Sequence, residues 1–104
     1  MNALLRSPRF EEWFHGLIDR RAKQVILARL TRIEQGNFGD VKPVGEGVSE
    51  LRIDVGPGYR VYFVRRGLAA YLLLLGGDKG SQKRDIEAAR AMARALKEES
   101  GGGG

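Results

Sequence analysis

Hydrophobic and polar residues alternate along two neighbouring stretches in the middle of the chain. In residues 50–55 and again in residues 59–65, apolar side chains recur at every second position. A period of two is typical of a strand that buries one face. Gly56-Pro57-Gly58 separates the two runs, and such residues favour a tight turn. The pattern therefore predicts a β-hairpin with a three-residue loop.

A three-residue loop also predicts which residues of the hairpin face each other. The apolar face would hold the pairs Val55 with Tyr59, Ile53 with Val61, and Leu51 with Phe63. The opposite face would hold the pairs Asp54 with Arg60 and Arg52 with Tyr62. Residues paired in this way interact directly across the sheet, so the second face gathers the polar side chains and is expected to be open or only partly covered.

Two segments before the hairpin carry helical spacing. Ser7 and Pro8 form an N-cap followed by a first-turn proline, and apolar residues recur behind them, which predicts a helix over residues 8–17. Asp19 can cap a second helix, which Gly36 would end in the left-handed conformation. The short joint predicts that the two helices pack as an antiparallel hairpin against the apolar face of the strands.

The remaining segments complete an α+β pattern. Residues 3–5 resemble a short edge strand, and residues 37–49 contain four helix or strand breakers, which predicts a loop with one β-bridge at 41–44. Residues 69–75 are apolar throughout, as in a central strand covered on both faces. A last helix is expected over residues 82–98. The prediction is a short N-terminal strand, a two-helix hairpin, an antiparallel sheet of three to four strands, and a C-terminal helix.

Composition limits the classes of function. Eighteen Lys and Arg against thirteen Asp and Glu give a net charge of +5, which is typical of small nucleic-acid-binding domains. The chain has no Cys and one His, so neither a disulfide framework nor a Cys or His-rich metal site is expected, and no cofactor is predicted. No apolar run is long enough to span a bilayer, and we expect a cytoplasmic protein. Residues 1–100 are predicted to form one domain, and residues 101–104 a glycine linker or artificial tail.

The polar face of the hairpin is the candidate chemical site. Arg52, Arg60 and Tyr62 share this face, and the segments that hold Lys79 and 83–85 follow the central strand and would reach its rim. Guanidinium groups bind phosphate as a bidentate fork, while Lys, Tyr or Asp can move protons. A metal-free ribonuclease needs such a set. A plain solvated face with an Asp54–Arg60 surface ion pair fits the same pattern.

Several separated motifs resemble one known family. These are residues 36–53 (GNFGDVKPVGEGVSELRI), 56–63 (GPGYRVYF), 75–79 (LGGDK) and 82–86 (QKRDI). They are similar to the HigB-type addiction-module killer proteins of the RelE/ParE toxin superfamily, over essentially residues 7–96. The resemblance implies a small α+β fold and a bacterial or phage-derived toxin of a type II toxin-antitoxin module. It also implies a cognate antitoxin, often of the helix-turn-helix type, and a toxin-antitoxin hetero-oligomer.

The resemblance also implies roles for single residues. Relatives of the RelE and HigB kind cut mRNA on the ribosome with basic residues on the sheet and near the last helix. Arg60, in the Gly-Tyr-Arg step, corresponds to the phosphate-binding arginine, Arg52 to the basic residue of the neighbouring strand, and Lys79 to the one after the last strand. A tyrosine that some relatives carry near the terminal helix has no match. The general base is open among Lys83, Asp85, Tyr62 and Lys42, with Asp85 or Lys83 preferred.

Two functions follow as alternatives. The first is a ribosome-dependent mRNA endoribonuclease that works by attack of the 2′-hydroxyl, with further basic residues on RNA or ribosomal phosphates. These RNA-binding candidates are Lys42, Arg84, Arg90 and Arg94. The second is a ParE-like toxin that inhibits DNA gyrase by protein binding, without phosphodiester chemistry, and the missing tyrosine favours it.

Overall fold

The computed structural model describes the backbone of residues 1–102 and the side chains of residues 1–99. The order of the elements is α+β, with a first strand, two helices, four consecutive strands and a long last helix. The elements are β1 (Ala3–Arg6), α1 (Pro8–His15), α2 (Arg20–Glu34), β2 (Val41–Gly45), β3 (Val48–Ile53), β4 (Tyr59–Gly67), β5 (Ala70–Asp78), the 3₁₀ turn η1 (Lys79–Ser81) and α3 (Gln82–Gly102).

One five-stranded sheet organises the chain, with the strand order β1-β5-β4-β3-β2. Strands β2 to β5 form an antiparallel meander, and β1 pairs with β5 in parallel. The α+β class and the C-terminal helix are confirmed. The prediction of three to four antiparallel strands was wrong in the number of strands and in the direction of β1. Strand β1 pairs in parallel with β5, which is far away in the sequence, and the four residues of β1 give no sign of the direction in which they pair.

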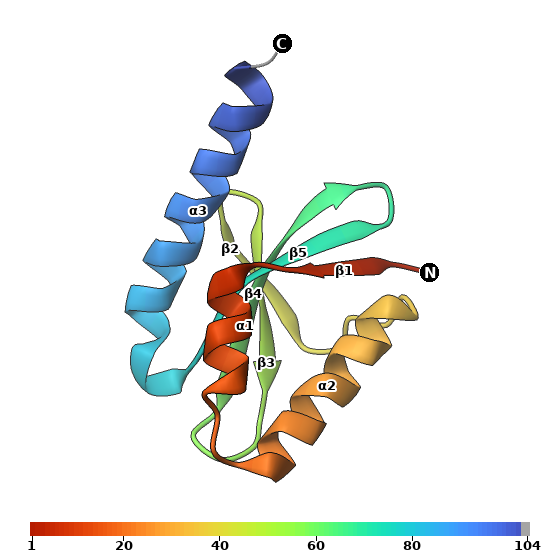
Figure 1. The fold of residues 1–104 in the computed structure, drawn as a ribbon, viewed down its shortest axis with the longest axis vertical. Coiled ribbons are helices and arrows are strands. Elements are labelled where there is room, and N and C mark those ends of the chain that lie inside the picture. Colours follow the sequence, from red (N-terminus) through yellow and green to blue (C-terminus); the bar gives the residue numbers. More distant parts are fainter. Residues whose placement is uncertain (103–104) are drawn as a thin grey trace.

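The helices cover both faces of the sheet (Figure 1). On one face α1 and α2 pack with β3, β4 and β5 around buried Phe10, Ile26 and Leu51. On the other face the first half of α3 packs Ala89 and Ala93 against the sheet. Strand β5 is covered on both faces, as predicted. The face of Arg52 and Arg60 is therefore not open over its whole length, because α3 lies on part of it.

The local signals at the helix ends are confirmed. Ser7 caps α1 by accepting a hydrogen bond from the Phe10 amide at 3.0 Å, and its hydroxyl donates to the Leu74 carbonyl at 2.6 Å. Asp19 accepts from the first amides of α2, and Gly36 has φ 91°. Helix α1 ends at His15, two residues earlier than predicted. Figure 1 shows α1 and α2 diverging from their joint as a V, so they share one core without lying alongside each other.

The register predicted for the β3–β4 hairpin was wrong by two residues. Ile53 pairs with Tyr59, so the loop has five residues, 54–58. The Gly58 amide donates to the Val55 carbonyl at 3.0 Å and closes a turn around Gly56 and Pro57. Because this turn takes up Val55, the ladder ends at Ile53. A shift of two residues preserves the faces, so the predicted apolar face is correct while the pairs across it change.

Residues 37–49 are more ordered than predicted. They contain strand β2, five residues long, and the start of β3 at Val48. Glu46, at φ 57°, and Gly47, at φ 77°, turn the chain between them. Of the breakers that indicated a loop, Gly47 lies in the turn of a second hairpin, whereas Pro43 and Gly45 lie within β2. The single bridge expected at 41–44 is a full edge strand.

The last helix is longer than predicted and runs to Gly102. Of the predicted glycine tail, Gly101 and Gly102 are therefore helical, whereas residues 103–104 lie outside the described part of the chain. None of the helices in the described residues is long and apolar enough to cross a membrane.

Candidate functional site

The candidate site lies where β3 and β4 pair, on the face toward α3. Arg52 stands directly opposite Arg60, and Glu50 directly opposite Tyr62. Because side chains alternate along a strand, all four project from the same face. The predicted partners Asp54 for Arg60 and Tyr62 for Arg52 are both wrong, since Asp54 lies in the loop and is exposed. Two arginines therefore face each other where a neutralising ion pair was expected.

Glu50 is the centre of a buried hydrogen-bond network. Its side chain is 0% exposed. One carboxylate oxygen, Oε2, accepts from the Tyr62 hydroxyl at 3.0 Å and from Gln82 Nε2 at 2.8 Å, while Oε1 accepts from Arg52 Nε at 3.2 Å. Burial raises the pKa of Glu50, but these three donors and the charge of Arg60 outweigh it and hold the pKa below its ordinary value. Glu50 is therefore a charged anchor for β3, β4 and α3.

Tyr62 supports the site from within. Its side chain is fully buried, and its pKa is raised, first by burial and then by the charge of Glu50 and the hydrogen bond to it. A phenol that stays neutral and donates to a carboxylate fixes that carboxylate in place. The structure thus brings Tyr62 to the predicted face but encloses its hydroxyl, away from solvent.

Arg60 keeps most of its donors free. Nη1 donates to the Tyr59 carbonyl at 3.1 Å, and Nε is buried with no hydrogen-bond partner among the described residues. Arg60 has no carboxylate within 4.0 Å in the described chain, although its positive charge acts to lower the pKa of both Glu50 and Tyr62. A guanidinium has five donors. Several donors of Arg60 are therefore left for an acceptor outside its own chain.

Lys79 joins Arg60 beside the hairpin loop. A methyl group on Gly58 would stand 3.6 Å from Arg60 Nη1 and 3.5 Å from Lys79 Cβ. Arg60 lies on β4 and pairs with Gly77 of β5, and Lys79 directly follows the end of β5. Arg52, Arg60 and Lys79 thus form what we call the cationic rim, at one end of the sheet. The sequence predicted these three residues as a set, and the structure brings them together.

Asp85 lies beside the rim on the first turn of α3. It is 7% exposed and accepts from the Ser81 hydroxyl at 2.5 Å. A Cβ on Gly77 would stand 1.9 Å from Asp85 Oδ2, so the carboxylate lies directly on the strand next to Arg60. Lys83, by contrast, is exposed. Of the two preferred general bases, only Asp85 is held against the sheet.

The predicted RNA-binding residues separate into two groups. Arg90 donates to the Val44 carbonyl, and Arg94 lies 3.8 Å from Glu46, so both tie α3 to the β2–β3 turn. Lys42 pairs across the sheet with Glu50 and is exposed on the edge strand. Arg84 is exposed on α3 and lines a cleft. Lys42 and Arg84 therefore remain candidates for a ligand, whereas Arg90 and Arg94 already have partners within the chain.

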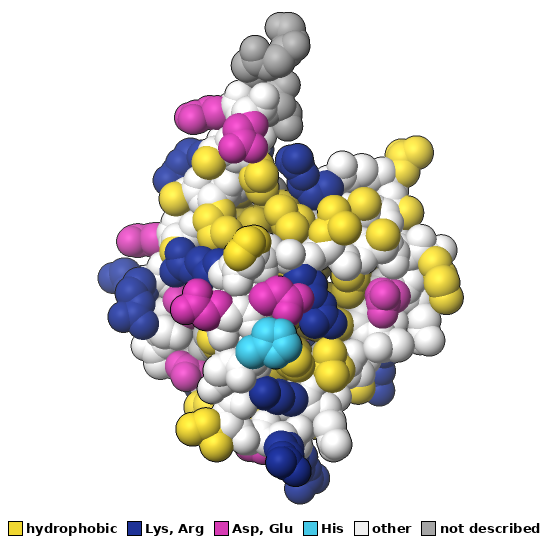
Figure 2. Space-filling model, viewed as in Figure 1, with side chains coloured by type: hydrophobic (Ala, Val, Ile, Leu, Met, Phe, Trp, Pro, Cys, Tyr) yellow, Lys and Arg dark blue, Asp and Glu magenta, His cyan; other side chains and the backbone are white. Residues whose placement is uncertain are grey.

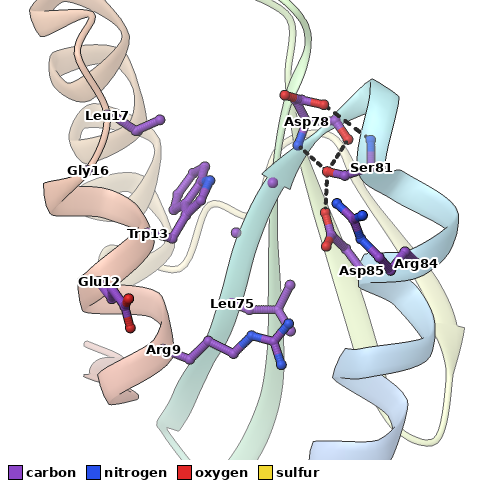
Figure 3. Close-up of a pocket in the computed structure, with 12 residues that line it drawn as sticks. Arg9, Glu12, Trp13, Gly16, Leu17, Leu75, Asp78, Ser81, Arg84 and Asp85 are labelled. Atoms are coloured by element: carbon purple, nitrogen blue, oxygen red, sulfur yellow. Dashed lines mark hydrogen bonds between the residues drawn. The ribbon is translucent and has the colours of Figure 1, made fainter.

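The cleft has a volume of about 560 Å³ and separates α1 from the start of α3 (Figure 3). Its floor is the end of β5 at Gly76 and Gly77. Trp13 and Arg9 line it from α1, and Arg84 and Asp85 from α3. Through Gly77, which pairs with Arg60, the cleft adjoins the cationic rim.

Several residues of the site were missed at the sequence level. Glu50 and Gln82 lie within the quoted motifs but were not among the candidates, and neither was Ser81. The signal that could have found Glu50 is its position two residues before Arg52, on the same strand face. Among the described residues, no three His, Cys, Asp or Glu side chains gather so that they could hold a metal ion.

Comparison with known proteins places the chain beside one bacterial relative. No protein-family profile matches the chain. A Haemophilus influenzae protein, described as an uncharacterized protein, is 47% identical over 87 residues, which cover 84% of this chain and 88% of that protein. The chain belongs to the family of that protein. Identity at this level over nearly the whole relative means that the two share the fold, although the relative's description names no activity.

For this member of the family, the geometry indicates what the site can do. The cationic rim presents several guanidinium and ammonium donors on a rigid sheet, held in place by a buried carboxylate. Such donors suit a phosphate group, which accepts several charge-assisted hydrogen bonds at once. Asp85 adds one carboxylate beside the same spot. The arrangement can bind a phosphodiester and place a carboxylate near it.

Proposed function

We propose that the protein is the toxin of a type II toxin-antitoxin module and a metal-free, ribosome-dependent mRNA endoribonuclease. The observation that carries the proposal is Arg60, which has unused donors, no ion pair within 4.0 Å in the described chain, and Arg52 and Lys79 as neighbours. A cation set of this kind suits a scissile phosphate. The resemblance of the motifs to HigB-type killer proteins supports the choice of RNA.

The reaction would proceed by attack of the 2′-oxygen on the neighbouring phosphorus. The new P–O2′ bond forms while the P–O5′ bond breaks, which leaves a 2′,3′-cyclic phosphate and a 5′-hydroxyl. A base takes the proton of the 2′-hydroxyl, and an acid gives one to the 5′-oxygen. In our proposal Arg60 and Arg52 stabilise the additional negative charge on the phosphorane, Asp85 is the candidate base, and Lys79 is the candidate acid. Lys83 is the alternative base.

The direct test is cleavage mapping of transcripts after induction of the protein in bacteria, and again with purified ribosomes and mRNA. We expect new 5′ ends in the presence of wild-type protein, and a loss of about a hundredfold in cleavage rate for Arg60→Ala. Arg66→Ala is the matched control, because Arg66 is an exposed arginine near the far end of the same strand. Cleavage that persists unchanged in Arg60→Ala would remove the phosphate-binding role.

A second function has one structural observation in its favour. Tyr62 and Asp85, both candidates for proton transfer, are buried and engaged in hydrogen bonds within the chain. A surface that binds but does not cut would need no free base, as in a ParE-like inhibitor of DNA gyrase. Intact transcripts together with a DNA-damage response after induction would select this alternative.

The proposed module also requires an antitoxin as partner, in the cytoplasm where mRNA and ribosomes are found. An apolar patch suited to a protein partner lies beside α3 (Figure 2). It consists of Pro8, Leu72, Leu74, Met92 and Leu96. Apolar surface of this kind commonly marks a protein contact. Co-purification of a small protein encoded in the neighbouring reading frame tests the partnership, and recovery of free toxin from an operon that expresses both would contradict it.

A further inference from the structure

The cleft between α1 and α3 is distinct in composition from the cationic rim. It is lined by one aromatic side chain, Trp13, by two arginines from different helices, by three carboxylates, and by the backbone of Gly76 and Gly77. Figure 3 shows Trp13 projecting from α1 toward β5, and Arg84 extending from α3 beside Asp85. An aromatic surface close to cations is what a nucleotide uses, since the base needs a flat apolar contact and the phosphate needs donors.

The two glycines are required by the groups on either side of the strand. A Cβ on Gly76 would stand 2.2 Å from the Trp13 ring, and a Cβ on Gly77 would stand 1.9 Å from Asp85 Oδ2. Strand β1 pairs with β5 only as far as Leu73. Beyond that point, among the described residues, no strand covers this edge of β5, and the cleft opens there. The floor of the cleft is therefore glycine backbone that lies between the Trp13 ring and the Asp85 carboxylate.

The arginines of the cleft are not neutralised by partners of their own. Within residues 1–99, neither Arg9 nor Arg84 makes an ion pair within 4.0 Å or a side-chain hydrogen bond, and both are exposed. Of the three carboxylates in the lining, Glu12, Asp78 and Asp85, the two aspartates are engaged within the chain, while Glu12 is exposed. Asp85 accepts from the Ser81 hydroxyl, and Asp78 accepts from the amides of Gly80 and Ser81 at 2.8 and 3.2 Å. Two guanidinium groups thus remain available to a phosphate.

We propose that this cleft binds one nucleotide of a single-stranded RNA, with its base against Trp13 and its phosphate between Arg9 and Arg84. The inference rests on the proposed function for its choice of RNA. Gly77 pairs with Arg60, so the cleft and the cationic rim adjoin each other across β5. An RNA strand that places one phosphate on the cationic rim can place a neighbouring nucleotide in the cleft. Binding of that nucleotide would fix the position of the RNA for cleavage.

The test uses the fluorescence of Trp13, which is the single tryptophan of the chain and therefore reports on the cleft alone. With excitation at 295 nm, the full-length protein is titrated with adenosine 5′-monophosphate, adenosine, ribose 5-phosphate and a 2′-O-methyl hexanucleotide that cannot be cut. We expect saturable quenching by the monophosphate and by the hexanucleotide. Adenosine lacks the phosphate and ribose 5-phosphate lacks the base. Each should therefore bind at least about tenfold more weakly than the monophosphate.

Variants assign the binding to the proposed contacts. Arg84→Ala should raise the dissociation constant of the monophosphate about tenfold, as expected for loss of a charge-assisted hydrogen bond, and Arg9→Ala should act in the same direction. Arg66→Ala, at the far end of β4, should leave the constant unchanged. Quenching that is insensitive to both Arg9→Ala and Arg84→Ala, or no saturable quenching at millimolar nucleotide, would overturn the proposal.

The anisotropy of a labelled hexanucleotide separates this proposal from the proposed function. If the hexanucleotide binds in a manner that depends on Arg60 while Trp13 fluorescence does not change, the cleft is not a nucleotide site and the ribonuclease proposal stands. If the monophosphate quenches Trp13 but the hexanucleotide does not bind, a free nucleotide is the ligand and the RNA proposal is overturned. If neither ligand binds, the cleft proposal fails, and the ribonuclease proposal is decided by the cleavage assay with ribosomes.

Discussion

The hydroxyl of Tyr62 donates to Glu50 Oε2 at 3.0 Å, between two side chains that are fully buried on neighbouring strands. A carboxylate without solvent is costly unless donors surround it. Here Tyr62, Gln82 and Arg52 supply three donors. The pair therefore joins β3, β4 and α3 below the cationic rim, and its ionisation connects stability to pH.

Replacement of Glu50 by Gln should make the protein less stable at neutral pH and less sensitive to acid. The native pKa of Glu50 lies below its ordinary value of 4.5, so the unfolded chain takes up a proton first as the pH falls. The stability from the carboxylate is thus present above pH 4.5 and is lost below it. We expect a deficit of about 2 kcal/mol for Glu50→Gln at pH 7, which shrinks as the pH falls below 4.5.

Urea unfolding at pH 7, 5, 4 and 3 measures this difference. Glu87→Gln is the matched control, because Glu87 is an exposed glutamate on α3 and its replacement should leave the pH profile unchanged. A deficit for Glu50→Gln that stays constant down to pH 3 would show that folding does not lower the pKa of Glu50.

Tyr62 should weaken the fold at alkaline pH. Its pKa is raised above the ordinary value of 10.0 by burial and by the negative charge of Glu50. The unfolded chain therefore loses the phenolic proton first, and the contribution of Tyr62 is present below pH 10.0 and is lost above it. Between pH 10 and 11.5, the unfolding free energy of the wild type should fall more steeply than that of Tyr62→Phe.

The measurement combines denaturant unfolding with absorbance of tyrosinate at 295 nm. In the wild type, one phenol should ionise only together with unfolding, and that step should be missing in Tyr62→Phe. Tyr71→Phe is the control, because the Tyr71 ring packs on Phe38 and Phe63. If Tyr62→Phe and Tyr71→Phe give the same alkaline profile, Tyr62 is not enclosed as described.

Gly76 should tolerate no side chain while Trp13 is present. A Cβ there would stand 2.2 Å from the indole, so either the ring or α1 must move. We expect Gly76→Ala to lower the unfolding free energy by about 2 kcal/mol and to shift the emission of Trp13. Gly67→Ala, where the nearest atom would be Ala70 Cβ at 3.8 Å, should be close to neutral.

A double-mutant cycle tests whether the indole itself causes the loss. In a Trp13→Leu background, Gly76→Ala should cost much less than in the wild type, since the ring that it meets is gone. Equal losses in the two backgrounds would mean that the strand needs glycine for its backbone and not for the close approach of Trp13.

Much of the fold could be predicted because local chemistry decides it. Ser7, Asp19 and Gly36 mark helix ends through their own hydrogen bonds or backbone angles, and the alternation in 50–55 and 59–65 fixes which side chains share a face. The direction of β1 and the five-residue loop were not predictable in this way. The direction of β1 depends on contacts between distant segments, such as the pairing of Ala3 with Ala70, and the loop length depends on the hydrogen bond from Gly58 to Val55, which the alternation does not mark.

The candidate site, too, could be predicted from the sequence only in part. The sequence predicted the set of Arg52, Arg60 and Lys79 because spacing along strands, together with the resemblance, identifies them. It did not predict that Glu50 would be enclosed, because a glutamate in an alternating strand looks like a solvated residue. The burial comes from α3, whose Gln82 reaches Glu50 from 32 residues away. The cleft at Trp13 was missed for a related reason, since it needs α1 and α3 on either side of β5.

Lys79 and Arg94 should respond differently when RNA affinity is measured against salt. Lys79 is exposed beside Arg60, whereas Arg94 lies 3.8 Å from Glu46 on the far part of α3. Each phosphate contact releases counterions, so its loss lowers the salt slope of log K by about one. Lys79→Ala should weaken binding of an uncleavable RNA and reduce the slope by about one. Arg94→Ala, which removes the same charge, should change neither quantity. An equal effect of the two variants would mean that overall charge attracts the RNA and that the cationic rim has no special part in binding it.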